Sequence, residues 1–203
     1  MTFDEIVRAR RSVRGFSDNP IPPGTVAALA EAARWAPSAC NSQTWRFVAI
    51  TDRAKIERLC REGMGPLLKN KWMTQAPLVI AGCVEPDIVS NRLGKKFTGI
   101  EYNTIDFGIA MEHIVLKATE LGLGTCWIGW LNTQRVAAII PAPEKIRILA
   151  LLAVGYPADE PPKNRKRKPL SSILFSETWG NPYPELPPPG PADSDTPEHC
   201  GAT

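Results

Sequence analysis

The segment over residues 102–121 constrains the fold most, because it is the longest stretch with a helical pattern and few charges interrupt it. Its large apolar residues are mixed with small ones and include Ile105, Ile109, Ile114 and Val115. A helix that is apolar around most of its circumference is normally buried on most sides. We therefore predict a buried central helix, terminated by the glycines at 122 and 124.

Shorter elements surround this helix in the sequence. Thr2 and Glu5 form a capping box that predicts a helix to about Arg11. The other expected helices cover the residues after Pro22-Pro23 up to Pro37, 52–62 and 133–140, and the expected strands cover 45–50, 78–84, 126–131 and 146–154. Helices and strands are interleaved without regular βαβ repetition, which predicts an α+β fold, a three-layer α/β/α sandwich.

The length of 203 residues allows one domain with a sizeable core. We place that domain over residues 1–183. Residues 184–203 are dominated by proline and small polar residues, which predicts a disordered tail. The longest fully apolar run, 148–154, is too short to span a bilayer, and no targeting segment is visible, so no membrane partner is expected.

The five cysteines are scattered along the chain, and no two of them form a C-x-x-C pair. An odd and scattered set is typical of reduced thiols, which predicts a cytoplasmic protein without a disulfide framework.

Four arginines occupy seven positions near the start of the chain, at Arg8, Arg10, Arg11 and Arg14. Basic residues are favoured at helix C-termini, so the cluster is compatible with a solvated helix end. Arginine is also suited to bidentate phosphate contacts, and Ser12 adds a hydroxyl donor. The residues alone leave both interpretations open. The net charge of +3 is modest and favours an anionic small ligand over nucleic acid.

A second basic run covers residues 163–168 and contains five basic residues in six positions. Taken alone, it is compatible with a solvated loop or with a polyanion-binding patch. No aromatic residues are interleaved with it, so a stacking platform for single-stranded nucleic acid is not indicated. The two basic clusters could converge on one phosphate.

Candidates for self-contained catalysis are few. The glycines at 122 and 124 follow a helix instead of joining a strand to a helix, so they do not fit the dinucleotide-binding motif. Cys126 lies in apolar surroundings and is interpreted as a structural thiol, and His113 as a core residue. No metal-ligand spacing is present. An enzyme with this sequence would therefore rely on a bound cofactor.

Five motifs, in order over roughly residues 2–180, resemble the FMN-dependent nitroreductase family. They are RRSVR at 10–14, PSACNSQTW at 37–45, GLGTCWIG at 122–129, VGYP at 154–157 and RKRKPL at 165–170. The resemblance implies a nitroreductase-like FMN-binding fold with a central mixed, mostly antiparallel sheet flanked by helices. It also implies a homodimer with two FMN sites at the subunit interface.

The resemblance assigns expected roles to particular residues. Around the flavin phosphate, ribityl chain and pyrimidine edge it places Arg10, Arg11, Ser12 and Arg14, and it adds Arg165 and Arg167 on the same phosphate. Near the flavin of the partner subunit it places Pro37, Ser38, Ala39, Asn41 and Gln43. Along the isoalloxazine face it places Ile128 and Gly129.

The implied activity is that of an FMN-dependent oxidoreductase that uses NADH or NADPH. The expected acceptors are nitroaromatics, quinones or similar electron-poor small molecules, reduced by a ping-pong mechanism without a catalytic protein acid or base. The family also contains flavin reductases, reductive dehalogenating enzymes and a flavin-destroying branch, and no motif selects among them. A rival interpretation is a non-enzymatic protein that binds a polyanion or nucleic acid through the basic runs, although no nucleic-acid partner is expected.

Overall fold

The computed structural model describes residues 1–65, 70–86, 98–160 and 165–185. The chain divides into two compact units, Met1–Pro161 and Pro162–Thr203. The predicted domain over 1–183 stays a prediction, and the predicted tail lies almost entirely outside the described residues. Among the described residues, the helices of the first unit are α1 (Phe3–Ala9), α2 (Thr25–Arg34), α3 (Arg53–Glu62), α5 (Tyr102–Glu120) and α6 (Thr133–Ile139), with short 3-10 turns η1 (Ala39–Asn41) and η2 (Lys71–Gln75).

Four strands of the first unit form one sheet in the order β1 (Trp45–Ile50), β2 (Leu78–Val84), β4 (Arg147–Gly155), β3 (Gly124–Ile128). All three neighbouring pairs are antiparallel. The only irregularity in their registers is a bulge at Leu149, because Gly82 pairs with Ala150 whereas Cys83 pairs with Ile148. An isolated parallel bridge joins Ser12 to Thr125. The sheet therefore agrees with the expectation of a mostly antiparallel one.

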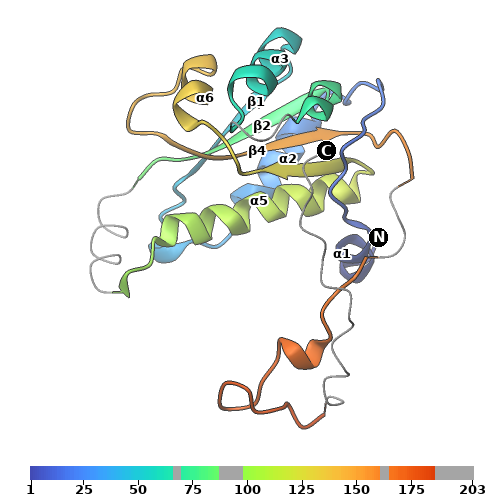
Figure 1. Ribbon diagram of the computed structural model, residues 1–203, viewed down its shortest axis with the longest axis vertical. Coiled ribbons are helices and arrows are strands. Elements are labelled where there is room, and N and C mark those ends of the chain that lie inside the picture. Colours follow the sequence, from blue (N-terminus) through green and yellow to red (C-terminus); the bar gives the residue numbers. More distant parts are fainter. Residues whose placement is uncertain (66–69, 87–97, 161–164, 186–203) are drawn as a thin grey trace. The chain divides into compact units, whose positions relative to one another are not determined.

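The central strand β2 is buried on both faces, so its alternate residues enter two separate cores. Leu78, Ile80 and Val84 pack with α2 and α5, whereas Val79, Ala81 and Cys83 pack on the opposite face with α3 and α6. Figure 1 shows α2 and α5 on one side of the sheet and α3 and α6 on the other. The α+β, three-layer prediction is confirmed.

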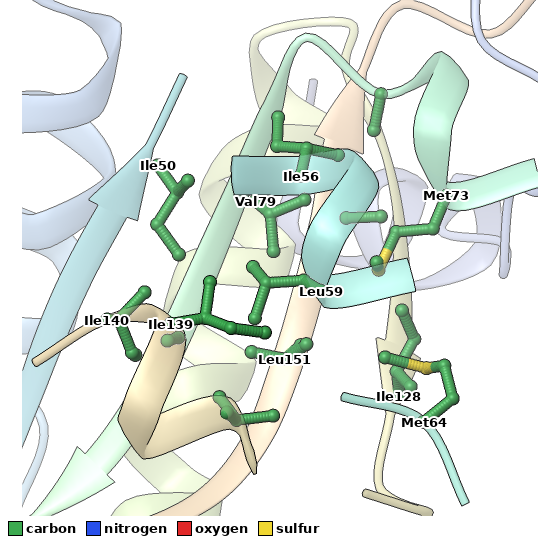
Figure 2. Close-up of a cluster of buried hydrophobic side chains, with 14 of the residues drawn as sticks. Ile50, Ile56, Leu59, Met64, Met73, Val79, Ile128, Ile139, Ile140 and Leu151 are labelled. Atoms are coloured by element: carbon green, nitrogen blue, oxygen red, sulfur yellow. The ribbon is translucent and has the colours of Figure 1, made fainter. Parts of the chain in front are cut away.

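The core on the α3 and α6 face also fixes the end of β3. Leu59 of α3, Val79 of β2 and Leu151 of β4 belong to one buried cluster with Ile128, the last residue of β3 (Figure 2). Leu151 is paired directly with Ile128 across the sheet. The position of Ile128 is therefore set by packing from three elements.

The predicted elements are present, but some of their ends differ. The first helix has the expected capping box and ends at Ala9, because Arg10 leaves the helical conformation with ψ 129°. Strand β3 covers Gly124–Ile128 instead of 126–131. Its predicted last residues pair elsewhere: Gly65 N donates to the oxygen of Trp130 at 3.2 Å, and an isolated antiparallel bridge joins Leu131 to Met64.

The central helix is buried along one side, half-buried over most of the rest, and exposed near its two ends. Phe107, Met111 and Ile114 are buried, whereas Ile105 is 49% exposed, so burial on most sides was too strong a prediction. In the part of the chain that the structure describes, no helix has the length and apolar character needed to cross a membrane.

Candidate functional site

The N-terminal arginine segment lies against the beginning of β3. Val13 N donates to the oxygen of Thr125 at 2.9 Å, next to the bridge between Ser12 and Thr125. Gly124 permits this approach, because a Cβ atom there would lie 2.6 Å from Cγ2 of Val13. The sequence interpretation of Gly124 as a helix terminator is therefore wrong; that role belongs to Gly122, whose φ is 75°.

The chain continues from this bridge along the residues that follow β4. Ser17 N donates to the oxygen of Tyr156 at 2.9 Å, and Ala158 N donates to the oxygen of Gly15 at 3.0 Å. The structure thus brings together three motifs that are far apart in sequence, those at 10–14, 122–129 and 154–157.

The arginines of this segment have different surroundings. Arg10 is half-buried, and its Nε lies 4.0 Å from Oε1 of Glu112 on α5. Burial raises the pKa of the Glu112 carboxyl, and the nearby charge of Arg10 opposes that effect. Arg11 donates through Nη1 to the backbone oxygen of Arg8 and, at 3.0 Å, to that of Arg10. Arg11 therefore contacts the helix end, as the first interpretation of the cluster predicted.

Two further members of the segment, Ser12 and Arg14, are exposed beside β3. A guanidinium can donate two parallel hydrogen bonds to a phosphate, and a hydroxyl can donate a third. The segment therefore has the donors that a monophosphate requires. Arg8, in the last turn of α1, is also exposed.

The end of β3 provides a different kind of surface. Ile128 is 4% exposed and packs into the core, whereas the following Gly129 is exposed. A Cβ atom at Gly129 would meet nothing within 4 Å. The backbone at this point is therefore accessible to a flat ring system, at the end of the strand whose beginning contacts the arginine segment.

The predicted interface loop has an unusual backbone. Three residues that are not glycine have positive φ: Cys40 at 52°, Asn41 at 54° and Gln43 at 46°. Inside the loop, Gln43 N donates to Oγ of Ser38 at 3.0 Å. At its beginning, Ala39 N lies 3.2 Å from each carboxylate oxygen of Asp106.

The loop and the arginine segment contact different faces of α5. Asp106 and Glu112 are six residues apart, which corresponds to about 9 Å along a helix and about 120° around it. Sequence reasoning did not select either residue. Both are acidic residues in a stretch with few charges, but the sequence does not show their burial or their contacts.

The remaining predicted residues, Arg165 and Arg167, lie in the second unit. Arg165 is half-buried, and Arg167 is exposed and donates through Nη1 to the oxygen of Lys166 at 2.9 Å. Lys163 and Asn164, which begin the basic run, lie outside the described residues. Convergence of the two basic clusters on one phosphate stays a prediction.

Residues considered for other chemistry have structural surroundings. Nδ1 of His113 lies 3.0 Å from the oxygen of Ala32, and Cys126 is 3% exposed, as expected for a core histidine and a structural thiol. No group of three or more His, Cys, Asp or Glu side chains that could hold a metal ion is found among the described residues.

The close approach of Val13 to Gly124 gives a first testable prediction. Gly124→Ala forces Val13 to move, so we expect the free energy of unfolding to fall by about 1–3 kcal/mol in urea denaturation. Gly108→Ala is the matched control, because a Cβ there meets nothing within 4 Å and alanine favours helix; it should be neutral or stabilising. Equal stability of the Gly124→Ala variant and the wild type would contradict the proposed packing.

A protein-family model described as the nitroreductase family matches residues 7–64 and 61–156 of the chain. A protein of Archaeoglobus fulgidus, named as a putative NADH dehydrogenase/NAD(P)H nitroreductase, is 30% identical over 163 residues, which cover 77% of this chain and 86% of that protein. A Bacillus subtilis protein named as an FMN reductase (NAD(P)H) is 26% identical over 198 residues, covering 88% and 76% respectively.

Solved structures of nitroreductase family proteins have a similar fold. A nitroreductase family protein from Clostridium difficile 630 is similar with a TM-score of 0.76 and 27% sequence identity, covering 88% of this chain and 99% of that one.

Proposed function

Because this chain belongs to the nitroreductase family, we propose that it is an oxidoreductase that binds FMN and uses NADH or NADPH to reduce electron-poor small molecules. Nitroaromatics and quinones are the proposed acceptors, and a ping-pong order the proposed kinetics. The observation that carries this proposal is the position of the arginine segment at the beginning of β3, with the open backbone of Gly129 at the other end of the strand.

The residues present fit a flavin mononucleotide. We assign Arg10, Arg11, Ser12 and Arg14 to its phosphate, ribityl chain and pyrimidine edge, and Arg165 and Arg167 to the same phosphate. We assign Ile128 and Gly129 to the face of its ring system. The loop residues Pro37, Ser38, Ala39, Asn41 and Gln43 are assigned to the flavin held by the partner subunit.

When bound, FMN supplies the redox chemistry by accepting a hydride from NAD(P)H and returning reducing equivalents to the acceptor. The protein binds and orients the participants. Arg14 carries a fixed positive charge, which favours the more negative, reduced form of the ring at its pyrimidine edge. The buried Ile128 side chain holds the end of the strand in the core, and the exposed backbone of Gly129 is assigned to contact the ring. No acid or base from the chain is required by this scheme.

Exposed apolar side chains support the proposal of a homodimer. In the first unit, Phe3 of α1 is 70% exposed and Ile105 of α5 is 49% exposed. In the second unit, Ile173 and Trp179 are 64% and 93% exposed. Exposed apolar side chains are available for burial in an interface, and we propose that a second copy of the chain covers them. The cysteines among the described residues are free, which supports a reducing compartment such as the cytoplasm.

The proposal is tested with purified protein and added flavins. We expect FMN to bind more tightly than riboflavin, because riboflavin lacks the phosphate. The FMN-loaded protein should then oxidise NADH or NADPH in the presence of a quinone or a nitroaromatic, with parallel lines in double-reciprocal plots. A protein that takes up no FMN contradicts the proposal. Salt-sensitive binding of a nucleic acid by such a protein would favour the polyanion interpretation.

A further inference from the structure

Asp106 is a buried carboxylate on the side of α5 that faces the sheet and α2. The residue is only 4% exposed, and its neighbours on the helix, Phe107 and Ala110, are fully part of the core. A charged group at such a position is costly unless it is hydrogen-bonded. Both of its oxygens lie 3.2 Å from Ala39 N, so the carboxylate connects the central helix to the loop that follows α2.

The loop that it contacts requires such an anchor. Cys40, Asn41 and Gln43 all have left-handed backbone conformations, which side chains other than glycine rarely adopt. Conformations of this kind persist only where the surroundings enforce them, and they are concentrated at ligand-binding segments. The bond from Gln43 N to Ser38 Oγ closes the loop on itself, whereas Asp106 fixes its beginning to a rigid helix.

We propose that Asp106 is a positioning residue of the cofactor site, which acts by holding the loop over residues 38–43 in the shape that contacts FMN in the partner subunit. This inference rests on the proposed function. It adds a residue that touches no cofactor and that belongs to a different subunit from the arginines of the site it serves. The assignment of the loop and the arginine segment to different sites comes from the family resemblance, and the structure attaches them separately to α5, at Asp106 and at Glu112.

Two substitutions at this position separate the hydrogen bond from the size of the side chain. Asp106→Leu has a similar branched outline and a somewhat larger volume but no acceptor, so Ala39 N–H loses its partner and the loop is released. We expect FMN affinity to fall about ten- to a hundredfold, as for the loss of a hydrogen bond to a charged group. Asp106→Asn retains an oxygen acceptor and should recover most of this affinity.

A destabilised control variant excludes a general effect of loosening the helix. Ile114 is buried in the same core, two turns further along α5, and is not in the loop contact. Ile114→Ala should lower the midpoint of thermal unfolding at least as much as Asp106→Leu, with little change in FMN affinity at a temperature where both variants are folded. Equal loss of affinity in the Ile114→Ala variant would overturn the positioning role.

A mixed dimer tests which subunit Asp106 serves. One chain carries Arg10→Ala, the other carries Asp106→Leu, and differently tagged copies are co-expressed and purified by both tags. If the loop acts on the partner's site, both defects fall in one site and the other site is intact. We then expect one FMN per dimer, bound with wild-type affinity.

If the loop acts on the cofactor site of its own chain, each site carries one defect and no wild-type site remains, which overturns the inference. A wild-type protein that binds no FMN contradicts the proposed function itself. A wild-type protein that binds FMN, together with an Asp106→Leu variant of equal affinity, overturns only the role of Asp106.

Discussion

Arg10→Glu is expected to abolish measurable FMN binding while the protein remains folded. Arg10 is half-buried next to the Ser12–Thr125 bridge, so its guanidinium is held where the phosphate is proposed to bind. Arg10→Ala removes charge-assisted hydrogen bonds and should weaken binding about ten- to a hundredfold. A glutamate adds repulsion, both from the phosphate and from Glu112, whose carboxylate lies 4.0 Å from Nε of Arg10. We therefore expect a loss well above a hundredfold for the charge reversal.

The measurement is titration of the apoprotein with FMN, followed by quenching of flavin fluorescence. Arg8→Glu is the matched control. It makes the same change of net charge as Arg10→Glu, at a residue that is exposed in the last turn of α1. At physiological ionic strength it should alter affinity by less than about threefold, since exposed charges away from the ligand are screened. Equal losses for the two variants would contradict a specific site and favour a general attraction of anions to basic surface.

The three-layer fold was predictable from the sequence because its signals are local. Capping at Thr2, the apolar runs at 78–84 and 146–154 and the long helical pattern each depend on nearby residues. The end of β3 was not predictable in this way. Trp130 and Leu131 are as apolar as a continuing strand would be, but they pair with Gly65 and Met64, and that pairing is decided by tertiary structure.

The candidate site shows the same division between local and tertiary information. The motifs named the arginine segment and the Ile128-Gly129 pair, but the sequence could not show that Val13 pairs with Thr125. Gly124 was misread for this reason, because its nearest sequence feature is a helix end whereas its spatial neighbour is Val13. Asp106 was missed because an acidic residue in a helix is usually solvated, and only the structure shows that this one is buried.

Leu151→Ala is expected to lower the free energy of unfolding by about 3 kcal/mol, within the usual range of 2–5 kcal/mol for a fully buried leucine. Leu151 is fully buried in β4, an inner strand of the sheet like β2, and packs in the cluster that contains Leu59 and Ile128 (Figure 2). Leu149→Ala, on the same strand at the bulge, makes the same chemical change at a partly exposed position and should cost clearly less. Urea denaturation of the apoprotein measures both.

The same variant tests how far the cofactor site depends on the core beneath it. Leu151 is paired with Ile128 at the end of β3, where the proposed ligand contact lies. The strand is also held at its beginning, where the arginine segment pairs with Thr125. We therefore expect FMN affinity to change only about threefold. Since a ligand at a hundred times its dissociation constant stabilises the native state by about 2.7 kcal/mol, saturating FMN should raise the stability of variant and wild type by nearly equal amounts. A variant that FMN fails to stabilise would show that the packing of Leu151 against Ile128, and not the arginine segment, sets the geometry of the site.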